Sequence, residues 1–352
     1  MDWADWEMDM FPLSFMEYLV RQNLQHMIVY VTNRCNYRCN HCFVDFSEKK
    51  EDLDLDYYIS LARQVGRLFW LDIGGGEPFL REDLPEIIAA FNTKIVMIPS
   101  NGSLRDLAVE QLQEIRRRTD AEIGVSLSID GFRETHDRIR NRKGSWDKVW
   151  ETYESIRKLD NISVKINTVL SRENYQEILD LMREVRKRGP DFHSVILLRG
   201  EPNDPAFGLP PLDELSSLIP EMLRILAAYH YGRNPLSAHI LRNYHRYLWM
   251  LSSKILREHT QVIPCLAGRA HMVVMADGSV CSCELLPPVG SIKTQSWNEI
   301  MKSNTFKAQL KFIMDKKCYC THNCALLCSI LFNPASIPHL IYSSAHGVEH
   351  GG

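Results

Sequence analysis

The chain has 352 residues, 45% hydrophobic and 24% charged, enough to bury a full core as one large domain or two unequal ones. Its 41 basic and 44 acidic side chains nearly balance, which argues against a surface built for nucleic acid or an anionic membrane. The start is acidic, unlike a secretory signal, and no apolar run approaches the roughly 20 residues of a membrane helix. We therefore expect a cytoplasmic protein without stable membrane insertion.

From His26 to His193, short β-rich runs alternate with helical patterns, which is typical of a parallel sheet built from βα units. Most predicted strands are near-continuous apolar runs, as a sheet covered on both faces requires; they are His26–Thr32, Leu68–Ile73, Lys94–Ser100, Glu122–Ile129, Ser163–Leu170 and Ser194–Leu198. The predicted helices are Asp56–Val65, Leu84–Phe91, Leu104–Arg117, Ser145–Lys158 and Tyr175–Lys187. We predict an α/β fold, a partial (β/α)6 barrel.

The second half of the chain has a different organisation. A helical pattern from Pro205 to Thr260 predicts a connector, and a small cysteine-rich module follows, with a hairpin around Asp277-Gly278 and a helix from Trp297 to Phe312. The predicted division is an N-terminal extension (1–25), the barrel (26–204), the connector (205–262), the cysteine-rich domain (263–335) and a tail (336–352), frayed from about Ser343.

The ten cysteines form two groups, three near the start and seven between Cys265 and Cys328. A reducing compartment keeps thiols available for metals instead of pairing them as disulfides. The distribution therefore predicts two metal centres, one from each end of the chain.

The first group, Cys35, Cys39 and Cys42, can wrap one loop around a four-iron cluster and give three of its irons a thiolate each. The fourth iron is then open to a small chelating molecule, which favours reactivity over a purely structural role. Zinc is the alternative metal, with His41 available as a fourth ligand.

Other unusual motifs also follow predicted strands, at the edge where such folds gather their chemistry. They are Gly74-Gly75-Gly76-Glu77-Pro78, Ser100-Asn101-Gly102, Asp130-Gly131 and Arg199-Gly200-Glu201. Glycines let backbone come close to a ligand, so we expect the first of these loops to reach into the site. Ser100 and Asn101 are either a plain turn or part of a ligand-lining loop.

The run Thr32–Cys42 resembles the CxxxCxxC signature of the radical S-adenosylmethionine (SAM) superfamily, with His41 where that family usually has an aromatic residue. The glycine-rich loop resembles the family's GGEP motif. This resemblance implies that backbone groups of Gly75 and Gly76, with Glu77, receive the amino group of SAM.

Residues 126–131 and 134–140 resemble the family subset with C-terminal auxiliary clusters. The resemblance makes Ser128, Asp130 and Arg140 candidates for binding the ribose or carboxylate of SAM. The alternative reading of each is a helix cap or a solvated surface charge.

Cys265, Gly278 and Cys283 have the spacing that opens the SPASM and twitch auxiliary-cluster domains, and they resemble that family. The last group departs from its pattern. We expect one [4Fe–4S] cluster on Cys265, Cys283 and two of the three thiols of Cys318, Cys320 and Cys324, with Cys281 and Cys328 as substitutes. Tetrathiolate zinc fits the same count.

The resemblance implies an enzyme with SAM and two [4Fe–4S] clusters that forms a 5'-deoxyadenosyl radical and abstracts hydrogen from a substrate. We expect oxidation or bond formation on a peptide or small-molecule natural-product precursor, with an electron donor such as flavodoxin or ferredoxin. Residues 1–25 leave no room for a fused leader-peptide-binding domain, and no catalytic acid or base is assigned. The alternative is a non-catalytic zinc or iron–sulfur interaction or electron-transfer protein, which explains the cysteines but not the glycine–Glu loop.

Overall fold

The computed structural model describes residues 11–44, 51–231 and 235–342, and a single nine-stranded sheet lies at its centre. Six strands pair in parallel and in chain order: β1 (His26–Tyr30), β2 (Leu68–Gly74), β3 (Thr93–Ser100), β4 (Glu122–Ser128), β5 (Ile162–Leu170) and β6 (Phe192–Leu197). These are the six predicted strands, shifted by two residues or fewer at either end. The predicted α/β fold with a partial barrel is therefore confirmed.

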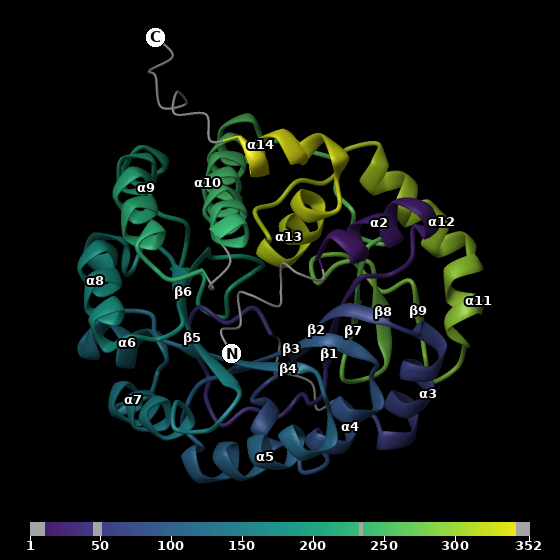
Figure 1. Cartoon of the computed structure of the whole chain (residues 1–352), viewed down its shortest axis with the longest axis horizontal. Coiled ribbons are helices and arrows are strands. Elements are labelled where there is room, and N and C mark those ends of the chain that lie inside the picture. The colour runs from purple at the N-terminus through teal and green to yellow at the C-terminus, as the bar shows by residue number, and fades with distance from the viewer. Residues whose placement is uncertain (1–10, 45–50, 232–234, 343–352) are drawn as a thin grey trace.

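Helices cover the outer face of this sheet (Figure 1). They are α3 (Leu55–Val65), α4 (Leu84–Ala90), α5 (Arg105–Arg118), α6 (Arg133–Ile139), α7 (Ser145–Ile156) and α8 (Ile178–Arg188), with short 3₁₀ turns η1 (Pro78–Leu80) and η2 (Tyr175–Glu177). Alternate strand residues point outward, so Leu71 and Ile73 of β2 join the main core with Leu112 of α5. The sequence analysis missed α6, a short helix with few apolar positions.

The barrel does not close between β1 and β6. Instead β1 pairs in parallel with β7 (His271–Val274), and an antiparallel pair continues the sheet through β8 (Ser279–Cys281) and β9 (Gly290–Ser291). The predicted hairpin at Asp277-Gly278 is present, and Gly278 takes the positive φ of 90° that its turn requires. The cysteine-rich module is thus an extension of the barrel sheet.

Helices from the second half of the chain stand beside the open side of the sheet (Figure 1). They are α9 (Leu212–Ala227) and α10 (Pro235–Glu258) in the predicted connector, then α13 (Asn323–Leu331), η3 (Pro334–Ser336) and α14 (Ile337–Ile341). α10 packs against α9, α13 and α14, and an N-terminal helix, α2 (Phe11–Arg21), places Tyr18 against Phe332. α14 lies within the predicted tail, whose residues from Ser343 are outside the described part of the chain.

None of the described helices is by itself long and apolar enough to cross a membrane. One pair of helices, Asn323–Leu331 and Pro334–Ile341, reaches the necessary length and apolar composition together, but the two are bent by 85° relative to each other.

The predicted single helix from Trp297 to Phe312 is wrong. The structure has two helices, α11 (Trp297–Lys302) and α12 (Asn304–Met314), separated at Ser303. Ser303 is extended, with ψ of 152°, and its hydroxyl accepts a hydrogen bond from the backbone N–H of Phe306. A serine that caps a free N–H in this way starts a new helix, and apolar spacing alone does not reveal the break.

Candidate active site

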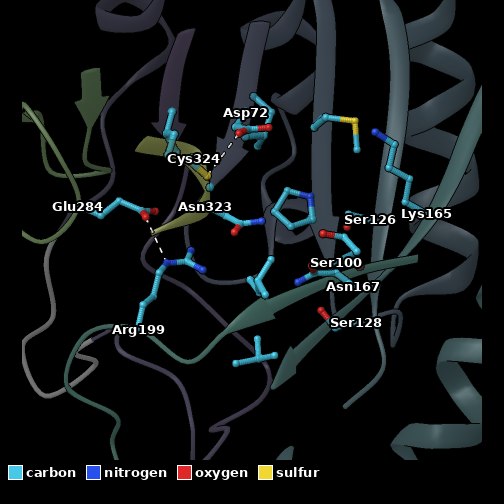
Figure 2. A pocket seen from close by; sticks show the side chains of 18 of the residues that line it. Asp72, Ser100, Ser126, Ser128, Lys165, Asn167, Arg199, Glu284, Asn323 and Cys324 are labelled. Carbon is cyan, nitrogen blue, oxygen red and sulfur yellow. Dashed lines mark hydrogen bonds and ion pairs between the residues drawn. The ribbon is translucent and has the colours of Figure 1, made fainter. Parts of the chain in front are cut away.

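The interior of the barrel holds a cavity of about 430 Å³. Every second residue of the strands faces it, including Trp70 and Asp72 of β2 and Lys165, Asn167 and Val169 of β5. Figure 2 shows Ser100, Ser126, Ser128, Lys165 and Asn167 on one side, opposite Asp72, Arg199, Glu284, Asn323 and Cys324. α10 and α13 close the open side with apolar residues such as Leu241, Tyr244, Leu327 and Leu331.

The first cysteine group lies at one end of this cavity, and Cys35, Cys39 and Cys42 all line it. Their loop follows β1 and is fixed by hydrogen bonds, among them the backbone N–H of Asn40 to the carbonyl of Ile139 at 2.9 Å. Burial, together with the nearby Glu77, Cys39 and Cys42, raises the pKa of the Cys35 thiol to about 11. A buried thiol of this kind needs a cation to stabilise its ionised form.

The spacing of the cysteines bears on the choice between a cluster and a single ion. Around one tetrahedral zinc ion, sulfurs lie about 3.8 Å apart. Within the described residues, the single group of three His, Cys, Asp or Glu side chains with ligand atoms all within 4.8 Å is His26, His271 and Cys328. The two predicted cysteine groups are thus more open than a mononuclear site, which favours a larger multi-iron cluster in each.

The glycine-rich loop packs directly on the cysteine loop. A Cβ atom on Gly75 would overlap the carbonyl oxygen of Thr32, and one on Gly76 would overlap that of Arg34. The backbone N–H groups of Gly76 and Glu77 donate to these same carbonyls at 2.9 Å. The glycines therefore permit contact between two loops, a reason that the sequence analysis did not find; both also line the cavity.

Glu77 is held at the cavity wall with its carboxylate 1% exposed. It accepts hydrogen bonds from the Ser100 hydroxyl at 2.9 Å and the Asn101 backbone N–H at 2.8 Å. Burial raises the pKa of Glu77 to about 7, although these donors oppose the rise. The structure thus brings together the predicted residues Gly75, Gly76, Glu77, Ser100 and Asn101, around a carboxylate suited to a cationic group.

Asp130 and Arg140 form a buried pair, with Nη2 and Oδ2 2.5 Å apart. Arg140 lines the cavity and donates to Cys39 Sγ at 3.8 Å, and Ser128 lines the cavity at the end of β4. Asp130 is fully buried and is not among the described residues that form the wall. Its carboxylate accepts the Val169 N–H at 2.9 Å and fixes Arg140, so its position is one of support behind the wall.

His41 lies 3.7 Å from Asp130, measured from Nε2 to Oδ2, and lines the cavity. Burial lowers the pKa of His41 to about 4, so its imidazole is neutral near pH 7. This side chain is close to the first cysteine group, and no described group of three donors within 4.8 Å includes it.

The second cysteine group brings four thiols into one neighbourhood. Burial, together with the nearby Cys320 and Cys318, raises the pKa of Cys265 to about 11. The pKa of Cys283 is also raised by burial and by Cys320 and Cys265. Four of the five thiols considered for this cluster, those of Cys265, Cys283, Cys318 and Cys320, thus share one site.

The remaining cysteines lie elsewhere. Cys324 lines the cavity, with its Sγ 3.9 Å from Asp72 Oδ2 (Figure 2). Cys281 is buried in a small apolar cluster under the hairpin. Cys328 contacts His26 Nδ1 at 3.4 Å.

A buried polar network joins the cavity to the second cysteine group. Glu284 accepts a hydrogen bond from the Tyr30 hydroxyl at 2.6 Å and lies 3.4 Å from Nε of Arg199 (Figure 2). It also pairs with His322 Nε2, and His322 Nδ1 lies 3.7 Å from Cys283 Sγ. Burial would raise the pKa of Glu284, but Arg199 and His322 hold it below its usual value. The sequence analysis missed Glu284 and His322. Both could have been noticed from the sequence, because Glu284 directly follows Cys283 and His322 comes two residues after Cys320.

Comparison with known proteins agrees with this geometry. The radical SAM superfamily profile matches residues 29–208, more than half of the chain, and the profile of an iron–sulfur cluster-binding domain, SPASM, matches residues 265–328. A cysteine-bearing loop on a partial barrel, followed by a SPASM domain, defines a radical SAM enzyme. The chain belongs to the radical SAM superfamily and carries a C-terminal SPASM domain.

Curated relatives differ in how much of the chain they match. AdoMet-dependent heme synthase of Methanosarcina barkeri is 28% identical over 78% of this chain and 80% of the relative. Fe-coproporphyrin III synthase of the same organism is 29% identical over 44% of this chain, and the sporulation killing factor maturation protein SkfB of Bacillus subtilis is 29% identical over 45%. The chain spans only 40% and 39% of these last two proteins.

Two solved structures have the same fold. SuiB of Streptococcus suis bound to S-adenosylmethionine has a TM-score of 0.61 and 14% identity, over 85% of this chain and 71% of SuiB. The protein anSMEcpe with AdoMet and the Kp18Cys peptide has a TM-score of 0.60 and 16% identity, over 82% of this chain and 84% of that chain.

Proposed function

We propose that this enzyme cleaves SAM reductively at a [4Fe–4S] cluster held by Cys35, Cys39 and Cys42. That cluster, when bound, supplies the electron that splits SAM into methionine and a 5'-deoxyadenosyl radical, which takes a hydrogen atom from the substrate. The observation that carries the proposal is convergence: the three cysteines, Glu77 and Arg140 line one end of a single cavity.

In the proposed SAM site, each side chain binds or positions a different group. The Glu77 carboxylate receives the ammonium group of SAM, beside Gly75 and Gly76, while Ser100 and Asn101 hold that carboxylate in place. Arg140 binds the SAM carboxylate and Ser128 the ribose, since both line the cavity. Asp130 acts through Arg140, which it orients from behind the wall.

We further propose a second [4Fe–4S] cluster on Cys265, Cys283, Cys318 and Cys320. Four thiolates leave no open iron, so this cluster serves electron transfer or substrate positioning and not SAM cleavage. The network from Cys283 through His322 to Glu284 supports this role, because it ends at the substrate cavity. The barrel at 26–204 and the auxiliary domain at 263–335 then each hold one cluster.

The cavity beyond the SAM site is the proposed substrate chamber. Its walls combine apolar residues with a few polar ones, among them the buried Lys165 and the partly exposed Arg199, which pairs with Glu284. A cavity of this size, mostly apolar with a few polar groups, favours a small molecule or one peptide side chain. The relatives include a heme synthase and a sporulation killing factor maturation protein, which supports oxidation or bond formation on a small molecule or a larger precursor.

The test is anaerobic purification followed by incubation with SAM and a reductant, either dithionite or reduced flavodoxin or ferredoxin. We expect a brown protein that forms 5'-deoxyadenosine, at a higher rate when the small-molecule or peptide fraction of a host extract supplies the substrate. A colourless protein with stoichiometric zinc and no deoxyadenosine would overturn the proposal in favour of a non-catalytic metal protein.

A further inference from the structure

Three buried metal-binding side chains meet outside the cavity, where the barrel joins the C-terminal module. His26 begins β1, His271 begins β7, and the two residues are directly paired in the sheet. Cys328 approaches them from α13. All three are 1% exposed or less, and none is among the residues that line the cavity.

The distances among these donors suit one tetrahedral ion. His26 Nδ1 lies 3.1 Å from His271 Nδ1 and 3.4 Å from Cys328 Sγ, and all three ligand atoms are within 4.8 Å of one another. Zinc bonds of about 2.0–2.1 Å to nitrogen and 2.3 Å to sulfur place such donors about 3.3–3.6 Å apart. Neither cysteine group of the enzyme has this compact arrangement.

The surroundings of His26 orient it as a ligand. Asp72 accepts the Trp70 Nε1–H on one carboxylate oxygen at 2.8 Å and meets His26 Nε2 on the other at 2.9 Å. Asp72 accepts the Nε2–H of His26, so when the ring is neutral, as a metal ligand must be, the lone pair of Nδ1 faces His271 and Cys328. Carboxylate–histidine–metal chains of this kind are the usual second shell of zinc sites.

We propose that His26, His271 and Cys328 bind one Zn²⁺ ion, as a metal centre separate from both cysteine groups. Its ligands come from β1, β7 and α13, so the ion ties the barrel sheet to the C-terminal module. Nitrogen and thiolate donors select zinc over hard cations such as magnesium. Three protein donors leave the fourth position of the ion to a water molecule, and we assign the site a structural role because its donors are buried and do not line the substrate cavity.

The test uses anaerobically purified, reconstituted full-length enzyme, with zinc and iron counted by mass spectrometry. We expect about one zinc per chain and, by zinc K-edge absorption, two imidazole nitrogens at about 2.0 Å with sulfur at about 2.3 Å. His271→Asn and Cys328→Ser should each reduce zinc at least tenfold. His193→Asn, another fully buried histidine, and Cys281→Ser, another buried cysteine, should keep it.

The zinc K-edge spectrum is recorded on the wild-type protein, so it identifies the zinc ligands even if the variants fail to fold. Wild-type enzyme without zinc, or a zinc spectrum with sulfur ligands alone, would overturn the proposal. So would full zinc retention in His271→Asn. Deoxyadenosine formation is measured separately. If the enzyme does not cleave SAM, the zinc content and the zinc spectrum still test the zinc site.

Discussion

Arg140 gives Cys39 an environment that differs from those of its two partner cysteines. The Arg140 guanidinium donates to Cys39 Sγ at 3.8 Å and also pairs with Asp130. We expect Cys39→Ala to abolish 5'-deoxyadenosine formation, because two thiolates cannot retain a four-iron cluster with one open iron. Iron should fall by about four atoms per chain. Cys281→Ala is the matched control, and unchanged SAM cleavage in Cys39→Ala would exclude the ligand assignment.

Glu77 predicts a pH dependence of SAM binding. Burial raises the pKa of its carboxyl to about 7, so the carboxylate is charged above that pH and protonated below it. An ammonium ligand requires the charged form. As the pH falls from about 7.5 to about 5.5, the Kd for SAM should therefore rise, by up to about tenfold per unit below the pKa.

Glu77→Gln should bind SAM weakly and lose this pH dependence while it keeps its iron. Glu134→Gln, which changes an exposed carboxylate, should behave like wild type. Calorimetric titration across the same pH range measures both variants. A pH profile in Glu77→Gln that matches wild type would show that another group controls binding.

At the scale of elements, the contact between the glycine-rich loop and the cysteine loop predicts a steric effect. Gly76→Ala puts a Cβ against the carbonyl of Arg34, which is backbone and cannot move alone. We expect a cost of about 1–3 kcal/mol in unfolding free energy and the loss of iron from the first cluster. Thermal denaturation and iron analysis measure the two effects.

Gly208→Ala is the control for this substitution. Its Cβ would meet only the flexible Arg172 guanidinium, at 3.3 Å, and should leave stability and iron nearly unchanged. Normal iron in Gly76→Ala would mean that the cysteine loop tolerates displacement.

The strands could be predicted because each is a short apolar run bounded by glycine, proline or polar residues. Helix ends were less predictable, since Ser303 breaks a continuous apolar pattern through one side-chain hydrogen bond. α13 was missed because it is apolar on most sides, and so has no helical periodicity to detect. The same burial explains its place against the cavity and α10.

At the scale of the whole molecule, the two cysteine groups predict separable functions. Reconstituted enzyme should carry about eight irons per chain, and Cys283→Ala about four. Because the first cluster remains, Cys283→Ala should still bind SAM and form some deoxyadenosine without substrate turnover. Product and deoxyadenosine are measured in the same reaction. If the soluble variant with its first cluster intact converts substrate as fast as wild type, the auxiliary cluster has no catalytic role.

The candidate site could be predicted where its residues follow strands, because parallel strands deliver their carboxyl ends to one edge. Glu77 and Ser100 were found in this way, whereas Arg140 was found through the family resemblance. Which four of the seven C-terminal thiols bind the second cluster depends on how α12 and α13 pack. The spacing of the cysteines in the sequence does not determine that packing. The same holds for Glu284 and Arg199, which meet only after the module has joined the barrel. The ligands of each cluster remain predictions.

The pairing of β1 with β7 also affects how the chain is made. His26 and His271 are 245 residues apart, so during synthesis β1 has its second neighbour only after the whole barrel and the helices α9 and α10 have been made. Until then one edge of a fully buried, apolar strand offers unpaired backbone groups to other chains. A gene truncated before β7 is therefore expected to yield insoluble aggregates, and slow, chaperone-dependent folding of the intact enzyme follows from the same long-range pairing.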